Sequence, residues 1–306
     1  MKIIIPLLPK LNGKKGILLT FMAAGMLLFA IGCKEQNSLL FSNSLLSSIE
    51  KVPDQTLFHF NVFGDSRDGN SIYEHLIIIA LAAGKPAFNV HVGDMISSPD
   101  NYEQWPSFKT ISEPLADAGG FWCLPGNHDV SDESSLSRLR DAYPSVPPEG
   151  YYTLGTSYTL NIFLNSEEVD SQSNAMSEIQ FNWLEQQLKS EQAGKNRFVI
   201  VYIHRPLFPQ NHHKSRPFMD NEAIHQLLLT YGVKLIFAGH EHNFSRLEKD
   251  GVHYIITGGA GSPLHDDSEG DAGYFHFVQV YYQNQRIIIR VIGISGDTLD
   301  QLSFNP

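Results

Sequence analysis

Short apolar, β-branched runs alternate with longer amphipathic stretches from residue 57 to the end of the chain. Each run has the length and composition of a buried strand. We expect strands at Phe58–Phe63, Phe88–Val92, Tyr151–Leu154, Tyr158–Asn165, Phe198–Ile203, Val233–Ala238, Phe244–Leu247, Val252–Thr257, Tyr274–Tyr282 and Arg286–Ile294. Because strands and helical patterns alternate, the sequence predicts a layered α/β domain.

Helical periodicity is found between several of these runs. It predicts helices at Ser71–Ala83, Ser177–Leu188 and Asn221–Tyr231, the second of them beginning with a serine cap. Another helix is expected within Tyr102–Ala118. We expect it to break at Pro106 and Pro114, because proline lacks the amide hydrogen that a helix needs.

The N-terminus differs in character from the rest of the chain. Four lysines precede Ile17–Ile31, an apolar run shorter than the roughly 20 residues that span a bilayer. The run ends in Ala30-Ile31-Gly32-Cys33, which resembles a bacterial lipobox. We therefore expect a signal peptide at 1–32, a lipidated Cys33, a Ser/Leu-rich tether at 33–56 and one domain at 57–306. The alternative is an uncleaved anchor helix. Either would leave the protein exported and held on a bacterial membrane, on its periplasmic or cell-surface side.

The charge of the chain limits its partners. Removing the four leader lysines from 22 basic residues leaves 18 against 33 acidic residues, a formal charge of −15. Nucleic-acid binders need a basic surface, so no nucleic-acid binding is expected. Lipidation of Cys33 would leave Cys123 as the only thiol, which excludes an intramolecular disulfide. Cys123 lies in the apolar stretch Phe121–Leu124 and is expected to be buried.

Five short polar segments carry the candidate chemistry, and each follows an apolar run. They are Gly64-Asp65-Ser66-Arg67, Gly93-Asp94, Gly126-Asn127-His128-Asp129, His204 and Gly239-His240-Glu241-His242. The carboxyl ends of strands are where an α/β fold collects its functional side chains. Oxygen ligands mixed with imidazoles suit first-row divalent metals, and two such ions can hold a phosphoryl group between them.

The order of these segments resembles that of the calcineurin-like metallophosphoesterases, which include the purple acid phosphatases. The resemblance extends from about Phe58 to Gly261. It implies two facing mixed β-sheets in a sandwich flanked by helices, four layers in all, with a metal site at one edge. It also implies two divalent or trivalent ions (Fe, Mn or Zn) as cofactors. The implied activity is hydrolysis of a small phosphomonoester or phosphodiester by a metal-bound hydroxide.

The resemblance also implies a role for each ligand. Asp94 would bridge the two ions, and Asp65 and His242 would complete the first site. The second site would take Asn127, His204 and His240. On a strand, His240 and His242 would point to the same side.

His128 and Asp129 are the expected catalytic pair. By the resemblance, Asn127 and His128 also contact the substrate, and His128 donates to a phosphoryl oxygen or protonates the leaving group. An imidazole titrates near neutrality and can serve as such an acid. Asp129 would orient or charge the His128 ring.

Two arginines are expected near the substrate. Arg67 stands where the family usually has a histidine ligand, and a guanidinium cannot bind a cation. It would either hold the substrate phosphate or pair with a carboxylate such as that of Asp68. Arg205 would either face the phosphate or be a residue that is solvated or paired inside the protein. A tyrosine like that of the purple acid phosphatases is not evident after Asp94, where Met95-Ile96-Ser97 follows.

A different class of function stays open. A non-catalytic, membrane-anchored lipoprotein could keep the fold as a binding module, and missing ligands would mark it. Only the usual histidine at position 67 is missing here. The sequence therefore favours a phosphoesterase over the binding module, and over a protein that merely binds metal.

Overall fold

The computed structural model describes residues 49–54, 56–168, 175–194, 197–211, 214, 218, 220–265 and 273–306. The predicted signal peptide, Cys33 and residues 34–48 of the tether lie outside these residues. Ile49–Pro306 forms one compact unit. Within the part that is described, no helix combines the length and the apolar character that crossing a bilayer requires.

The strands of the described residues form two six-stranded mixed sheets, in the orders β12-β11-β10-β1-β2-β3 and β4-β5-β6-β7-β9-β8. The first sheet contains β1 (Phe58–Phe63), β2 (Phe88–His91), β3 (Phe121–Cys123), β10 (His276–Gln283), β11 (Arg286–Gly293) and β12 (Thr298–Phe304). The second contains β4 (Tyr152–Gly155), β5 (Thr159–Phe163), β6 (Phe198–Ile203), β7 (Leu235–Ala238), β8 (Phe244–Lys249) and β9 (Val252–Thr257). Parallel pairing joins β1, β2 and β3 in one sheet and β5, β6, β7 and β9 in the other.

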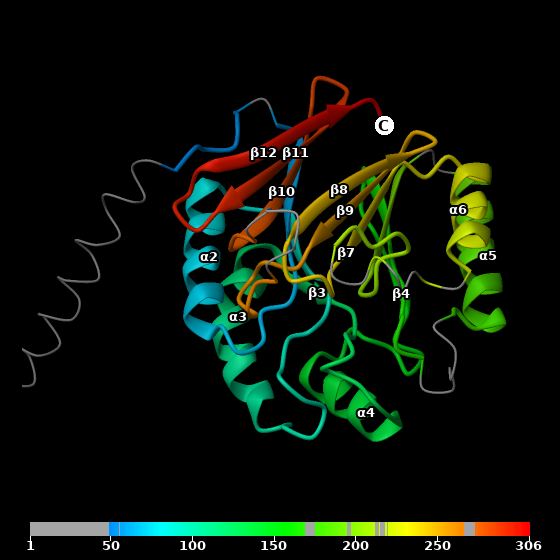
Figure 1. Ribbon diagram of the computed structural model, residues 1–306. Coiled ribbons are helices and arrows are strands. Elements are labelled where there is room, and N and C mark those ends of the chain that lie inside the picture. Colours follow the sequence, from blue (N-terminus) through cyan, green and yellow to red (C-terminus); the bar gives the residue numbers. More distant parts are fainter. Residues whose placement is uncertain are drawn as a thin grey trace, which may run out of the picture. The chain divides into compact units, whose positions relative to one another are not determined.

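Helices cover the outer faces of both sheets (Figure 1). The helices are α2 (Asn70–Ala83), α3 (Gln104–Gly119), α4 (Glu133–Ala142), α5 (Glu178–Gly194) and α6 (Asn221–Thr230). Helices α2 and α3 pack on the first sheet, whereas α5 and α6 pack on the second. These four layers confirm the predicted sandwich.

The core between the sheets is aromatic and aliphatic. Phe60, Val90, Phe163, Tyr202 and Phe237 belong to one buried cluster that draws on both sheets. A second cluster of buried side chains lies between the second sheet and the helices α5 and α6. Strands that lie between two apolar layers are buried on both faces, which is why they are continuous apolar runs in the sequence.

Most element predictions are confirmed to within two residues, but the predicted break in α3 is wrong. The helix runs unbroken from Gln104 to Gly119 with Pro114 inside it. Pro106 lies in the first turn, where the missing amide hydrogen would have had no acceptor in the helix. Pro114 does cost a hydrogen bond, and the helix continues because Phe108 and Leu115 on its inner face are buried.

Candidate metal centre

The predicted ligands follow strands that meet at one edge of the sandwich. Asp65 follows β1 and Asp94 follows β2, two neighbouring parallel strands. His204 follows β6 and His240 follows β7, which are parallel neighbours in the other sheet. Parallel strands end at a common edge, so four separate chain segments deliver polar side chains to one place.

Three of these side chains form a compact group of acceptors. One ligand atom from each of Asp65, Asp94 and His242 lies within 4.8 Å of the other two. His242 Nε2 is 3.7 Å from Asp65 Oδ1. All three residues are buried, the carboxylates almost completely. Two carboxylates and an imidazole make a donor set that suits a first-row divalent metal.

A second group of acceptors shares Asp94 with the first. His204 Nε2 lies 3.1 Å from Asn127 Oδ1 and 3.3 Å from Asp94 Oδ1. His204 Nδ1 lies 2.8 Å from the carbonyl oxygen of Val92, which can only accept, so Nδ1 is the donor of that hydrogen bond. Nε2 therefore faces the oxygens of Asn127 and Asp94, and a metal cation between these three atoms would take all of them as ligands. The residues therefore fit a second metal ion beside the first.

The ring of His242 is oriented in the same way as that of His204. Its Nδ1 lies 2.8 Å from the carbonyl oxygen of Pro263. A hydrogen bond from Nδ1 to a backbone carbonyl fixes the tautomer and leaves Nε2 as the ligand atom, a common arrangement around protein-bound metals. Burial lowers the pKa of His242 to about 4, so its ring is neutral near pH 7.

The backbone at the site is held in an uncommon conformation. Asp65, Asp94 and His240 have φ angles of 57°, 59° and 70°, in the left-handed region. Aspartate and histidine tolerate this region at a cost, and such residues gather at functional sites. Gly126 packs directly on Asp94, since a Cβ there would overlap the Asp94 backbone and carboxylate. The strand ends are therefore shaped to bring the ligands close together.

Burial and mutual repulsion act on the carboxylates. Burial raises the pKa of Asp65 well above its usual range, and the charge of Asp94 raises it further. Burial also acts to raise the pKa of Asp94, but His204, His128 and Arg67 together bring it below its usual value. Ionisation of two neighbouring buried carboxylates is unfavourable unless a positive charge lies close to them, and metal ions would supply that charge.

His240 does not sit on a strand, so the strand argument for its direction is wrong. Gly239–Asn243 forms the loop between β7 and β8, with a left-handed turn at His240. His240 donates its backbone N–H to both oxygens of Asp65, at 3.1 and 3.0 Å. Its ring packs edge-to-face against that of His204, with ring centroids 5.1 Å apart. The loop thus contributes to the site through backbone as well as side chains.

Arg205 adopts the internal pairing that the sequence left open. Its guanidinium forms two hydrogen bonds with the Glu167 carboxylate, at 2.7 and 2.9 Å. Its Nη1 also lies 3.3 Å from His240 Nε2. Arg205 therefore orients the His240 ring, and Glu167 holds Arg205 in turn. The sequence offers no signal for Glu167, which lies 38 residues before its partner.

Asp129 does not orient His128 as expected. Its two oxygens accept four backbone N–H groups, from Asp94, Met95, Ile96 and Gly126, at 2.8 to 3.1 Å. The carboxylate is fully buried, and it fixes the loop that carries Asp94 to the loop that carries Asn127. Its role is to position a predicted ligand, because all of its acceptor capacity is used by backbone.

His128 is oriented by a backbone carbonyl instead. Its Nδ1 lies 2.8 Å from the carbonyl oxygen of Ser97. Its backbone N–H donates to Asp94 Oδ1 at 2.9 Å. The side chain is partly exposed, which a group that meets substrate requires. Ser97 was missed as a site residue, since only its main chain takes part.

Arg67 lies between two carboxylates at the edge of the first group. Its Nη1 donates to Asp68 at 2.8 Å, and its Nε is 3.5 Å from Asp94 Oδ2. The Nε–H is buried, and no hydrogen-bond partner for it exists among the described residues. Asp68 is 43% exposed and lies outside the close group of Asp65, Asp94 and His242.

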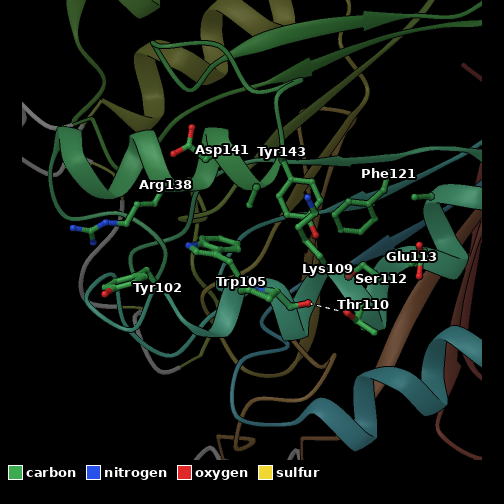
Figure 2. Close-up of a pocket in the computed structure, with 13 residues that line it drawn as sticks. Tyr102, Trp105, Lys109, Thr110, Ser112, Glu113, Phe121, Arg138, Asp141 and Tyr143 are labelled. Atoms are coloured by element: carbon green, nitrogen blue, oxygen red, sulfur yellow. Dashed lines mark hydrogen bonds between the residues drawn. The ribbon is translucent and has the colours of Figure 1, made fainter. Parts of the chain in front are cut away.

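A separate hollow of about 690 Å³ opens between α3 and α4 (Figure 2). The aromatic side chains of Trp105, Phe121 and Tyr143 and the basic side chains of Lys109 and Arg138 belong to its lining (Figure 2). None of the predicted site residues lines it. The hollow is therefore distinct from the candidate metal centre.

Comparison with known proteins gives three informative similarities. Mouse tartrate-resistant acid phosphatase type 5 is 31% identical over 163 residues, covering 45% of this chain and 48% of that protein. The structure of a purple acid phosphatase from yellow lupin seeds matches with a TM-score of 0.67 at 19% identity, over 83% of this chain and 55% of the other. The zebrafish protein solved as a dimetal phosphatase matches with a TM-score of 0.63 at 16% identity, over 82% and 99% of the two chains.

The curated relative is longer than the matching region, since this chain spans about half of its length. The two solved structures are too dissimilar in sequence to indicate more than a shared fold. The family model for calcineurin-like phosphoesterases matches residues 58–244, which contain every predicted site residue. This match covers more than half of the chain, and the chain belongs to the calcineurin-like phosphoesterase family.

Proposed function

We propose that this protein is a metal-dependent hydrolase of phosphate esters. The observation that supports it best is the pair of acceptor groups that share Asp94. Asp65 and His242 form one group with it, and Asn127 and His204 form the other. A carboxylate common to two such groups is suited to bridge two metal ions. The relatives named as phosphatases give the same reaction class.

Bound metal ions would supply an activated water and would neutralise the charge of the phosphoryl group. The protein's own groups would do the rest. Asn127 and His128 would bind the phosphoryl oxygens, and His128 would give a proton to the leaving alcohol. The loop carrying Asp94 is fixed by Asp129, which keeps the bridging position rigid when substrate binds.

The test is to measure the metal content of the purified chain together with its turnover of nitrophenyl phosphate and bis(nitrophenyl) phosphate. About two ions per chain and turnover that disappears on chelation are expected for a dinuclear site. A chain that takes up no metal and hydrolyses neither ester would instead be the non-catalytic binding module.

Arg67 is proposed to bind the substrate phosphate. Its buried Nε–H, which has no hydrogen-bond partner among the described residues, would donate to a phosphoryl oxygen beside Asp94. A guanidinium donates best to two oxygens at once, and a monoester has more ionisable oxygens than a diester. The Arg67→Ala variant should therefore raise the KM for the monoester by about tenfold, and less for the diester. Equal KM values for wild type and variant on both substrates would assign Arg67 to structural pairing with Asp68.

We also propose that the protein is exported and anchored to a bacterial membrane by a lipid on Cys33. The support is the sequence Ala30-Ile31-Gly32-Cys33 after a short apolar run. Mass spectrometry of the mature protein should give an N-terminal peptide that begins with modified Cys33. The Cys33→Ser variant should lose the lipid and leave the membrane fraction. An intact Met1 in membrane-bound wild type would point to an uncleaved anchor.

A further inference from the structure

We propose that Gln104, at the start of α3, is a positioning residue for His128 and acts through Ser97. The inference rests on the proposed function, since it assigns a residue to the acid of that reaction. Gln104 lies outside every predicted site segment, and its relation to His128 is visible only in the folded chain.

The first link joins Gln104 to Ser97. Gln104 Oε1 accepts the backbone N–H of Ser97 at 2.7 Å and the Ser97 hydroxyl at 2.9 Å. One amide oxygen thus takes both donors of one residue, which restricts rotation of Ser97 about its backbone. Because Gln104 is the first residue of a helix of 16 residues, the acceptor is mounted on a rigid element.

The second link joins Ser97 to the ring of His128. The Ser97 carbonyl oxygen is 2.8 Å from His128 Nδ1. A carbonyl can only accept, so Nδ1 keeps a proton in both ring states, and Nε2 is the atom that can take up a second proton and pass it to the leaving group. A shift of Ser97 that turned its carbonyl away would remove this acceptor, and the ring would then lose both its fixed tautomer and its direction.

The loop after β2 is held at two points with separate consequences. Asp129 binds the backbone of Asp94, Met95 and Ile96, and so secures the predicted bridging ligand. The Gln104 side-chain oxygen binds the N–H and the hydroxyl of Ser97, and so secures the residue whose carbonyl faces His128. Loss of the Gln104 acceptor should therefore slow the chemical step and leave metal binding intact.

A double-mutant cycle tests this arrangement. Gln104→Ala and the near-isosteric Gln104→Met both remove the acceptor, and either can be placed in wild type and in His128→Ala. We expect kcat to fall by about tenfold in wild type, with unchanged metal content and KM, as is typical when the support of a functional imidazole is lost. In the His128→Ala background the same substitution should change kcat less than about twofold, because residues that act as one unit are not additive.

Two further variants separate positioning from general damage. Gln104→Glu keeps an acceptor oxygen at the same place and should restore most of kcat. Glu103→Ala alters the exposed neighbouring residue and should behave as wild type. Equal losses of kcat in both His128 backgrounds, or loss of metal with Gln104→Met, would overturn the proposal in favour of a structural role.

A spectroscopic readout is independent of turnover. In the zinc-loaded protein, ¹⁵N shifts of the His128 ring, assigned by their absence in His128→Ala, should report a single tautomer with the proton on Nδ1. Gln104→Met should convert this to a mixture. If the wild type hydrolyses no ester, the proposed function is wrong. The ¹⁵N shifts of the His128 ring would still show whether Gln104 orients that ring through Ser97. Identical shifts in wild type and Gln104→Met would refute it.

Discussion

Replacement of Asp94 by asparagine should remove bound metal and turnover together. Asp94 belongs to both acceptor groups, whereas Asp65 and His204 each belong to one. A neutral amide offers one good donor oxygen in place of two and removes a full negative charge from the site. We expect metal to bind at least about 100-fold more weakly, since changes to residues that only support ligands cost about 10–100-fold and this change removes a ligand.

The variant should nevertheless fold. The asparagine oxygen can still accept the His128 N–H that Asp94 Oδ1 accepts at 2.9 Å. The loss of charge also relieves the repulsion that raises the pKa of Asp65. The metal-free variant should therefore unfold at a temperature close to that of the metal-free wild type. Asp117→Asn makes the same chemical change on the exposed face of α3 and serves as the control.

Elemental analysis and turnover of both nitrophenyl esters would measure the outcome. Full metal occupancy in Asp94→Asn would refute the bridging assignment. Loss of one ion with the other retained would place Asp94 in a single site. A lowered unfolding temperature of the metal-free variant would show that Asp94 also supports the fold itself.

The predicted strands are close to those observed because burial on two faces leaves a strong local signal. β1, β6 and β9 have the predicted limits. β12 and α4 were missed for opposite reasons. β12 lies at the edge of its sheet with alternating exposed positions, so its apolar content is low. α4 is a short, polar helix whose main signal is a capping box at Asp132 and Ser135.

The candidate ligands could be found in the sequence because their chemistry is local, but the residues that support them could not. Asp65, Asp94 and Asn127 lie within four residues after β1, β2 and β3, which are parallel strands that end at one edge of their sheet. Gln104 and Glu167 act through contacts that depend on how helices and loops pack. Asp129 is adjacent to His128 in sequence, yet its carboxylate binds the Asp94 loop instead. Sequence proximity therefore suggested the wrong partner for His128.

Replacement of His128 by alanine should leave metal bound and slow turnover strongly. Its ring hydrogen bonds to the Ser97 carbonyl, and its contact with Asp94 is made by the backbone N–H, which alanine keeps. The ligand groups should therefore stay intact. Loss of a general acid typically slows a reaction by 10²–10⁴-fold, so kcat should fall by about 100-fold or more.

The size of that loss should depend on the leaving group. An alcohol of high pKa needs a proton as it departs, whereas nitrophenolate can leave without one. Alkyl phosphates should thus suffer more than nitrophenyl phosphate in His128→Ala. His75→Ala is a matched control, because His75 is also partly buried and one of its ring nitrogens, here Nε2, lies against a backbone carbonyl, that of Ile294 at 3.1 Å. Equal losses for alkyl and nitrophenyl esters would make His128 a phosphate-binding group, and an unchanged kcat for both would remove it from the reaction.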